Sequence, residues 1–121
     1  MGSFYSVRGW LEGDDDHVDQ IKRIIAQNVD RNPYTESWCF QDRGGGFSRF
    51  VFFGCTVRDA SLPEVRAQVL RIAETVSSRD GPDVDFIEGT FHVGAEDDAV
   101  RVSWECRGGQ FRETAVPPSA A

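Results

Sequence analysis

The stretch from residue 47 to residue 58 constrains the fold most, because it is the most hydrophobic part of the chain and alternates with a period of two. One face of the expected strand carries Phe47, Val51, Phe53, Cys55 and Val57. The other face carries Phe50 and Phe52. A strand that is apolar on both faces is typical of the covered centre of a sheet. We therefore expect a central strand here, with its aromatic side chains in the core rather than in a ligand-stacking platform.

Apolar side chains at helical spacing predict two amphipathic helices. The first begins near Asp16, the expected N-cap, and its apolar stripe consists of Val18, Ile21, Ile24, Ile25 and Val29. The second begins at Ser61, which forms the pattern of a capping box with Glu64, and Pro63 falls in its first turn. The stripe of this helix consists of Leu62, Val65, Val69, Ile72, Ala73 and Val76.

Shorter segments of period two predict the remaining strands. They lie at residues 3–12, around 38–40, near 84–93, near 99–107 and at 111–113. Turns are expected at the glycines of 44–46 and at the break of 79–82.

The fold class that follows is α+β, a mainly antiparallel sheet of about five strands with two amphipathic helices on one face, in the order β-α-β-β-α-β-β. A single domain is expected to span residues 1–114, and the tail 115–121 is expected to be disordered.

The size and charge of the chain exclude several classes of protein. With 121 residues it has room for one hydrophobic core, and no apolar run is long enough to cross a bilayer. The N-terminal residues lack a signal-peptide pattern, so we expect a cytoplasmic protein that does not bind membranes. Because 20 acidic residues outweigh 13 basic ones, giving a net charge of -7, the phosphate backbone of a nucleic acid would be repelled. We expect no direct nucleic-acid binding.

The three cysteines and two histidines do not form a recognisable reactive site. Cys39, Cys55 and Cys106 are odd in number and lack Cys-x-x-Cys spacing, so we expect reduced, mostly buried thiols. His17 and His92 have no serine, cysteine or ligand residue at a diagnostic spacing, so we expect a surface or sheet-face role for both. The acidic clusters lack the pattern of a calcium loop. We expect no enzyme activity, no metal site and no cofactor.

The acidic residues are concentrated in two stretches. The segment 12–19 holds five of them and the segment 80–98 holds seven, and neither segment contains an Arg or Lys. Such a surface is usually a solvated face that keeps the protein soluble. It also steers and holds a basic partner, because opposite potentials raise the association rate and fix the register of the complex.

The order of the segments resembles the immunity protein 7 family of bacterial polymorphic toxin systems, as does Gly9-Trp10 in the first strand. Members of that family open with a strand carrying Gly-Trp, continue through a helix, a hairpin and a second helix, and end in a hairpin with an acidic turn. The matching features span most of this chain and are Gly9-Trp10, the helix ending near Val29, the helix from Leu62 to Val76, Glu96-Asp97-Asp98, Trp104 and Arg107-Gly108-Gly109. The resemblance implies a non-enzymatic protein that binds and neutralises a cognate toxin, often a nuclease, made by the same cell.

We therefore expect an immunity protein, monomeric or homodimeric, that neutralises a nuclease-type toxin through an acidic surface. The expected partner-binding residues are the acids of both stretches and one aromatic anchor in a loop: Asp14, Asp15, Asp16, Asp19, Tyr34, Asp83, Asp85, Glu88, Glu96, Asp97 and Asp98. Two alternatives stay open. One is a ferredoxin-like module whose sheet binds a small ligand, possibly as a dimer. The other is a small enzyme that uses His92 with Glu88 or Glu105.

Overall fold

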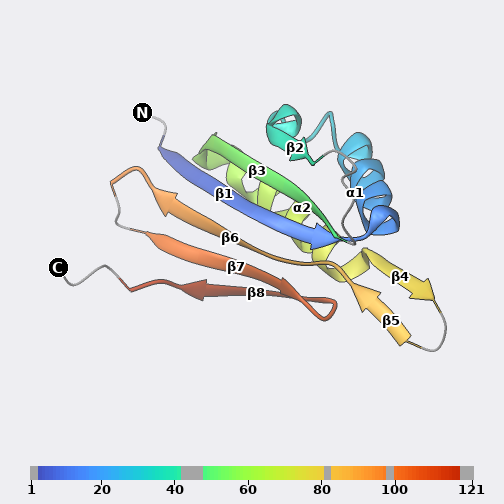
Figure 1. Ribbon diagram of the computed structural model, residues 1–121. Coiled ribbons are helices and arrows are strands. Elements are labelled where there is room, and N and C mark those ends of the chain that lie inside the picture. Colours follow the sequence, from blue (N-terminus) through green and yellow to red (C-terminus); the bar gives the residue numbers. More distant parts are fainter. Residues whose placement is uncertain (1–2, 42–47, 81–82, 98–99, 118–121) are drawn as a thin grey trace.

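A computed structural model describes residues 3–41, 48–80, 83–97 and 100–117, with the side chains of residues 79, 80 and 83 left out. A six-stranded sheet forms the body of the molecule, and α2 lies behind its strands (Figure 1). The strand order is β2 (Trp38–Phe40), β3 (Arg49–Arg58), β1 (Phe4–Gly13), β6 (Glu88–Ala95), β7 (Arg101–Arg107) and β8 (Gln110–Ala115). Every neighbouring pair in this sheet is antiparallel.

Two helices and a small second sheet complete the described chain. The helices are α1 (Asp15–Gln27) and α2 (Leu62–Thr75), and short 3-10 turns occupy η1 (Thr35–Ser37) and η2 (Asp59–Ser61). The second sheet pairs β4 (Ser77–Asp80) with β5 (Asp83–Phe86). No helix among the described residues is long and apolar enough to span a membrane.

The predicted α+β class, the antiparallel sheet and the two helices are confirmed, but the structure has more strands than the five expected. Strands β2, β3, β1 and β6, with the two helices as crossovers, follow the order of a split βαβ arrangement. Strands β7 and β8 extend it at one edge. Residues 79–80 of the predicted break at 79–82 instead belong to β4, whereas residues 81–82 lie outside the described residues. The single strand predicted near 84–93 is divided between β5 and β6.

One face of the sheet is covered by the helices and holds the core. Its fully buried side chains come from alternate positions of the strands: Val7, Leu11, Val51, Phe53, Val57, Phe91, Val93, Trp104 and Cys106. The helices contribute Val18, Ile21, Ile24, Ile25, Val65, Val69, Ile72 and Ala73. Gly9 and Gly89 allow a close approach in this layer, because a Cβ at Gly9 would collide with the Thr90 carbonyl and a Cβ at Gly89 with the Trp10 carbonyl.

The other face of the sheet, which we call the open face, carries no helix among the described residues (Figure 1). As predicted, β3 has a neighbouring strand on each side, but its second apolar face is not covered. Phe52 is 48% exposed and Trp10 on β1 is 38% exposed. The prediction that the aromatic residues of 47–58 lie in the core is therefore wrong for Phe52, because both helices occupy the same side of the sheet. Phe47 and the predicted glycine turn lie outside the described residues.

Several local predictions also need correction. The N-cap of α1 is Asp14 rather than Asp16, and Val29 follows the end of that helix and is 55% exposed. Ser61 precedes α2 but its side chain makes no capping hydrogen bond. Strand pairing continues two residues into the predicted tail, because Ala115 pairs with Val102 and the Val116 N–H donates to the Arg101 carbonyl. Residues 118–121 of that tail lie outside the described residues.

The cysteines differ in exposure more than the sequence suggested. All three are free, as predicted, but Cys39 is exposed, Cys55 is half-buried and only Cys106 is buried. Burial raises the pKa of the Cys106 thiol to about 12, which keeps it protonated and unreactive at neutral pH.

Candidate partner-binding site

The first acidic stretch is held at the start of α1 by a reciprocal cap. The Asp14 carboxylate accepts a hydrogen bond from the His17 backbone N–H at 2.9 Å. In return, the His17 ring nitrogen Nδ1 accepts from the Asp14 backbone N–H at 3.0 Å. Asp15 and Asp16 follow in the first turn, at the positive end of the helix dipole, where carboxylates are favoured.

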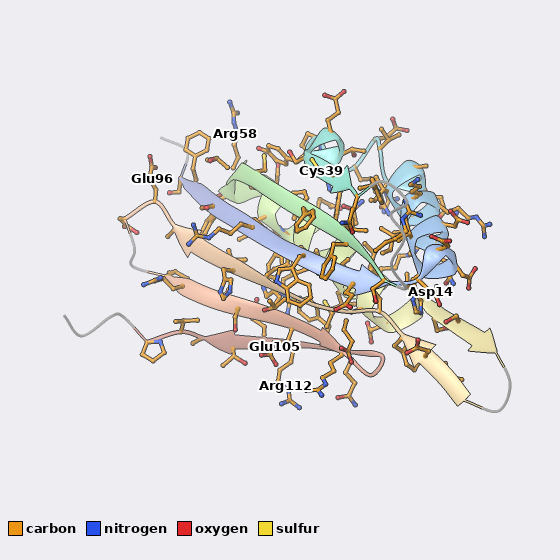
Figure 2. The ribbon with its side chains drawn as sticks, in the orientation of Figure 1. Asp14, Cys39, Arg58, Glu96, Glu105 and Arg112 are labelled. Carbon is orange, nitrogen blue, oxygen red and sulfur yellow. The ribbon has the colours of Figure 1, made fainter. Side chains whose placement is uncertain are left out.

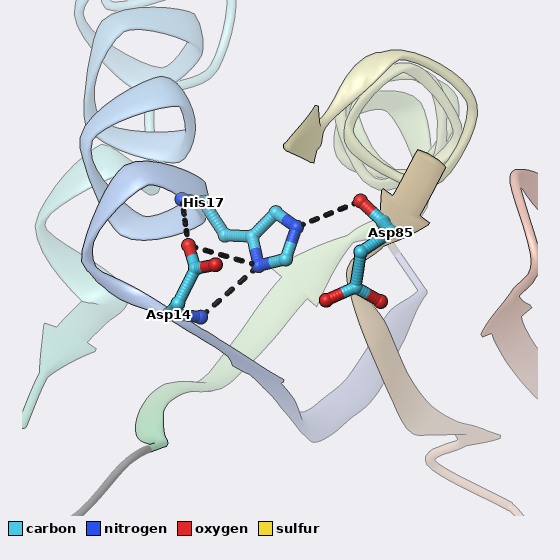
Figure 3. A group of neighbouring side chains, drawn as sticks. All are labelled: Asp14, His17 and Asp85. Carbon is cyan, nitrogen blue, oxygen red and sulfur yellow. Dashed lines mark hydrogen bonds and ion pairs between the residues drawn. The ribbon is translucent and has the colours of Figure 1, made fainter. Parts of the chain in front are cut away.

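His17 is buried, with 1% of its surface exposed. Because Nδ1 accepts a hydrogen bond, the hydrogen-bond network assigns the ring proton to Nε2, which donates to the Asp85 backbone carbonyl at 2.9 Å (Figure 3). The Ser78 hydroxyl lies 3.2 Å from Nε2 and donates to the Asp14 carboxylate at 3.3 Å. The expected surface or sheet-face role is therefore wrong for His17, which ties the start of α1 to β4 and β5.

Three potential metal ligands meet at this point. Ligand atoms of Asp14, His17 and Asp85 lie within 4.8 Å of one another. A metal ligand needs a free nitrogen lone pair, but Nδ1 of His17 gives its lone pair to the helix cap and Nε2 carries the proton. Metal binding by His17 would break the cap, so the geometry favours a structural role for the ring.

The second acidic stretch meets the first at the same end of the sheet. Asp85 comes from β5, and Glu88 on β6 lies directly opposite Glu12 on β1. An open hollow of about 390 Å³ lies between them, lined by Glu12, Gly13, Asp14, His17, Ser48, Asp85, Phe86 and Glu88. No Lys or Arg is among these lining residues. We call the acidic residues gathered here the acidic end: Glu12, Asp14, Asp15, Asp16, Asp85 and Glu88.

Of the arginines whose side chains the structure describes, Arg49 and Arg107 form ion pairs with the acidic end. Arg49 pairs with Asp15 at 3.2 Å, and its side chain is 15% exposed. Arg107 lies 3.9 Å from Glu88, and both of these side chains are largely exposed, so water and salt screen the pair. Among the described side chains, six carboxylates lie at this end and two guanidinium groups reach them, so the described part of this surface is negative.

The remaining predicted acids lie elsewhere or outside the description. Asp19 is exposed one turn further along α1. Glu96 lies at the opposite end of the sheet from Asp14 (Figure 2), next to Phe4, whose carbonyl accepts from the Glu96 N–H. Asp97 follows Glu96, and the β1–β6 ladder that separates them from Glu88 is roughly 24 Å long. Asp98 and the side chain of Asp83 lie outside the described residues.

Tyr34, the predicted aromatic anchor, is packed against the core and half-buried. Its hydroxyl accepts a hydrogen bond from the Arg58 backbone N–H at 3.0 Å, and its own N–H donates to the Asn32 side chain. A ring held in this way has less surface to offer a partner than Trp10 or Phe52.

The sequence reasoning missed an aromatic patch on the open face, formed by Trp10, Phe50 and Phe52. The Trp10 and Phe50 rings meet edge to face with centroids 5.9 Å apart, and Phe50 stacks on Phe52 at 6.1 Å. A signal was available in the sequence, because two helices on one side of a sheet leave alternate residues of every strand uncovered. The other histidine, His92, also lies exposed on this face, between Arg8 and Ser103.

A comparison of the sequence with protein-family models and with curated proteins finds no match.

Proposed function

We propose that the chain is an immunity protein that binds and neutralises a cognate bacterial toxin of nuclease type through the acidic end. The observation that carries this proposal is the convergence of two acidic stretches on one hollow, with His17 and Asp85 hydrogen-bonded although 68 residues separate them in the chain. The resemblance to the immunity protein 7 family supports the same function. A nuclease cleft is basic because it binds phosphates, so a concentrated negative surface can occupy it in place of nucleic acid.

The acidic end is also rigid, which favours tight binding. Its helix cap, the buried His17 ring and the Ser78 hydroxyl fix the start of α1 against β4 and β5. A binding surface that is already ordered loses less conformational entropy when a partner docks. Asp16 and the Asp85 side chain remain exposed on this fixed frame, where they can steer a basic surface at long range.

The first test concerns the function itself. The proposal expects a large toxin with a variable C-terminal domain to be encoded immediately upstream of the gene for this chain. Co-expression of that domain with the full chain should yield a complex that survives purification and should abolish the toxicity of the domain. A neighbouring toxin domain that neither binds the chain nor is inhibited by it would refute the proposal.

The second test concerns the surface. The double variant Asp16→Lys, Asp85→Lys should lower the association rate with the toxin domain by about tenfold at low ionic strength, and less at high salt. A matched control, Asp59→Lys with Glu64→Lys, makes the same charge change at the start of α2 near the opposite end of the sheet. Equal rates for the two double variants would show that the toxin docks elsewhere while leaving the neutralising function in place.

A small-ligand module remains the second candidate, because one observation favours it. The open face has a hollow of about 330 Å³ whose lining includes Arg8, His92 and Arg101 together with one carboxylate, Glu96, and the two guanidinium groups can bind an anionic ligand. A saturable rise in melting temperature with one compound of a metabolite library would support this function. Loss of that rise in Arg8→Ala would place the ligand in this hollow.

A further inference from the structure

The strand registers sort the charges of the open face along the direction of the strands. Arg8 on β1 lies opposite His92 on β6, and two residues later Trp10 lies opposite Thr90. Two residues further, Glu12 lies opposite Glu88. The open face therefore changes along β1 and β6 from basic through aromatic to acidic.

We infer that two copies of this chain pack face to face through their open faces, about a two-fold axis that passes near Trp10 and reverses the strand direction. This axis brings Trp10 of one copy to Trp10 of the other. It sets Arg8 against Glu12 of the second copy, and His92 against Glu88 of the second copy. The Arg8–Glu12 and His92–Glu88 contacts each occur twice, as a two-fold axis requires, and the Trp10 contact lies on the axis and occurs once. The inference does not depend on the proposed function, because it uses Glu12 and Glu88 of the acidic end, whereas the test of toxin binding uses the exposed Asp16 and Asp85.

The shape of β3 fits the same axis. Phe50 and Gly54 lie two residues on either side of Phe52, on the open face. The axis therefore sets the Phe50 ring of one copy over Gly54 of the other. The space above Gly54 is open, since a Cβ built there meets nothing within 4 Å. A large side chain in each copy thus meets a gap in its counterpart, which is how facing sheets interdigitate.

The axis also sets Glu105 on β7 against Glu105 of the second copy, and Arg112 on β8 against Arg112 of the second copy, because both lie at the level of Thr90. Glu105 on β7 and Arg112 on β8 lie opposite each other in the ladder, so each copy presents a neutral pair there. Figure 2 shows both side chains at the β7–β8 side of the sheet, and Glu105 lines a hollow together with Trp10 of the aromatic patch.

A second copy fits this face better than a uniformly basic partner. A basic protein would match Glu12 and Glu88 but would be repelled by Arg8 and by the neighbouring Arg101, which lies opposite Gly94. A second copy places an opposite charge against the acidic residues and against Arg8 at the same time. The area of the open face is also large enough for a stable dimer. A six-stranded face measures roughly 800 Å², about the area that each partner buries in a stable interface.

Sedimentation velocity of the full chain tests the inference. The chain should shift from monomer to dimer as its concentration rises. Arg8→Glu and Glu12→Arg should each raise the dissociation constant by roughly tenfold or more, since each places like charges together at two symmetry-related contacts. A one-to-one mixture of the two variants should dimerise again, because each variant then meets the opposite charge at both contacts.

The control is Arg23→Glu, which makes the same charge change at an exposed position of α1 and should leave the dissociation constant unchanged. Circular dichroism confirms that each variant folds. A chain that stays monomeric up to its solubility limit would overturn the inference, and this measurement needs no variant. A mixture of Arg8→Glu and Glu12→Arg that dimerises no better than either variant alone would overturn the proposed axis.

Discussion

The two faces of the sheet carry aromatic side chains from the same strands, yet they place them in opposite environments. Phe53 and Phe52 are neighbours on β3, and the first is 2% exposed whereas the second is 48% exposed. On β1, Leu11 is fully buried and Trp10 is 38% exposed. The pattern of the sequence assigns each residue to a face, but the position of the helices decides which face is core and which is available for binding.

The largest expected difference between the two faces is in the unfolding free energy lost by Phe53→Ala and by Phe52→Ala. Phe53 packs on Trp38 with ring centroids 4.9 Å apart, so its loss leaves a cavity and should cost about 3–5 kcal/mol of unfolding free energy. Phe52→Ala should cost less than about 1 kcal/mol, because water already reaches the ring. Urea unfolding at low protein concentration, where a dimer is not populated, measures both. Similar costs for the two variants would mean that the open face is covered in the isolated chain.

The covered layer was largely predictable from periodicity. Val18, Ile21 and Ile25 on α1, and Val65, Val69 and Ile72 on α2, lie in the core because helical spacing aligns them on one side. The strands of period two also fall close to their predicted positions. These features depend on local spacing, which the sequence records directly.

The candidate site was less predictable, because it depends on contacts between distant segments. The acids of 12–19 were noted as a group, but nothing local to them indicates that Asp85 and Glu88 return to the same hollow while Glu96 does not. His17 looked exposed because acids surround it in the sequence, whereas its ring is buried through hydrogen bonds to Ser78 and Asp85. The sequence predicts a strand at Asp85 but no strand at Ser78, which lies on β4.

The glycines on the two faces allow a sharper comparison. A Cβ at Gly9 would collide with the Thr90 carbonyl oxygen at 2.3 Å and with Phe91, so Gly9→Ala should destabilise the fold by about 1–3 kcal/mol through overpacking. Gly54→Ala, on the open side, should be neutral or stabilise by about 0.5 kcal/mol, because alanine restricts the unfolded chain. Thermal unfolding of the two variants provides the measurement. A destabilised Gly54→Ala would contradict the open space above that residue.

The two histidines extend the comparison to polar groups. His17→Ala removes hydrogen-bond partners from the Asp14 N–H and the Asp85 carbonyl, and should cost about 1–3 kcal/mol. His92→Ala, exposed on the open face, should change the stability of the monomer by less than about 0.5 kcal/mol. Amide hydrogen exchange adds a local readout, since protection near the start of α1 should fall only in His17→Ala. Unchanged protection there would mean that the ring does not hold the acidic end together.

The smallest effect on stability is expected for a substitution of Glu113, which lies where β8 meets α2 on the covered side of the sheet. Burial pushes the pKa of Glu113 up, but hydrogen bonds from Trp104 at 2.8 Å and Arg66 at 3.1 Å, together with the Arg66 charge, hold it below its ordinary value near 4.5. A carboxyl group whose pKa is lowered by folding adds stability above that ordinary value and loses it as the pH falls through the lower, folded-state value. The side chain is 40% exposed, so screening keeps the contribution below about 1 kcal/mol.

Glu113→Gln should therefore melt slightly below the native chain at neutral pH, and the two melting curves should converge as the pH drops below the ordinary pKa. The same substitution made in an Arg66→Gln background should show a smaller pH-dependent difference, because the charge that lowers the pKa is then missing. A gap in melting temperature that stays constant between neutral and acidic pH would assign the effect of Glu113 to packing against Trp104 rather than to its charge.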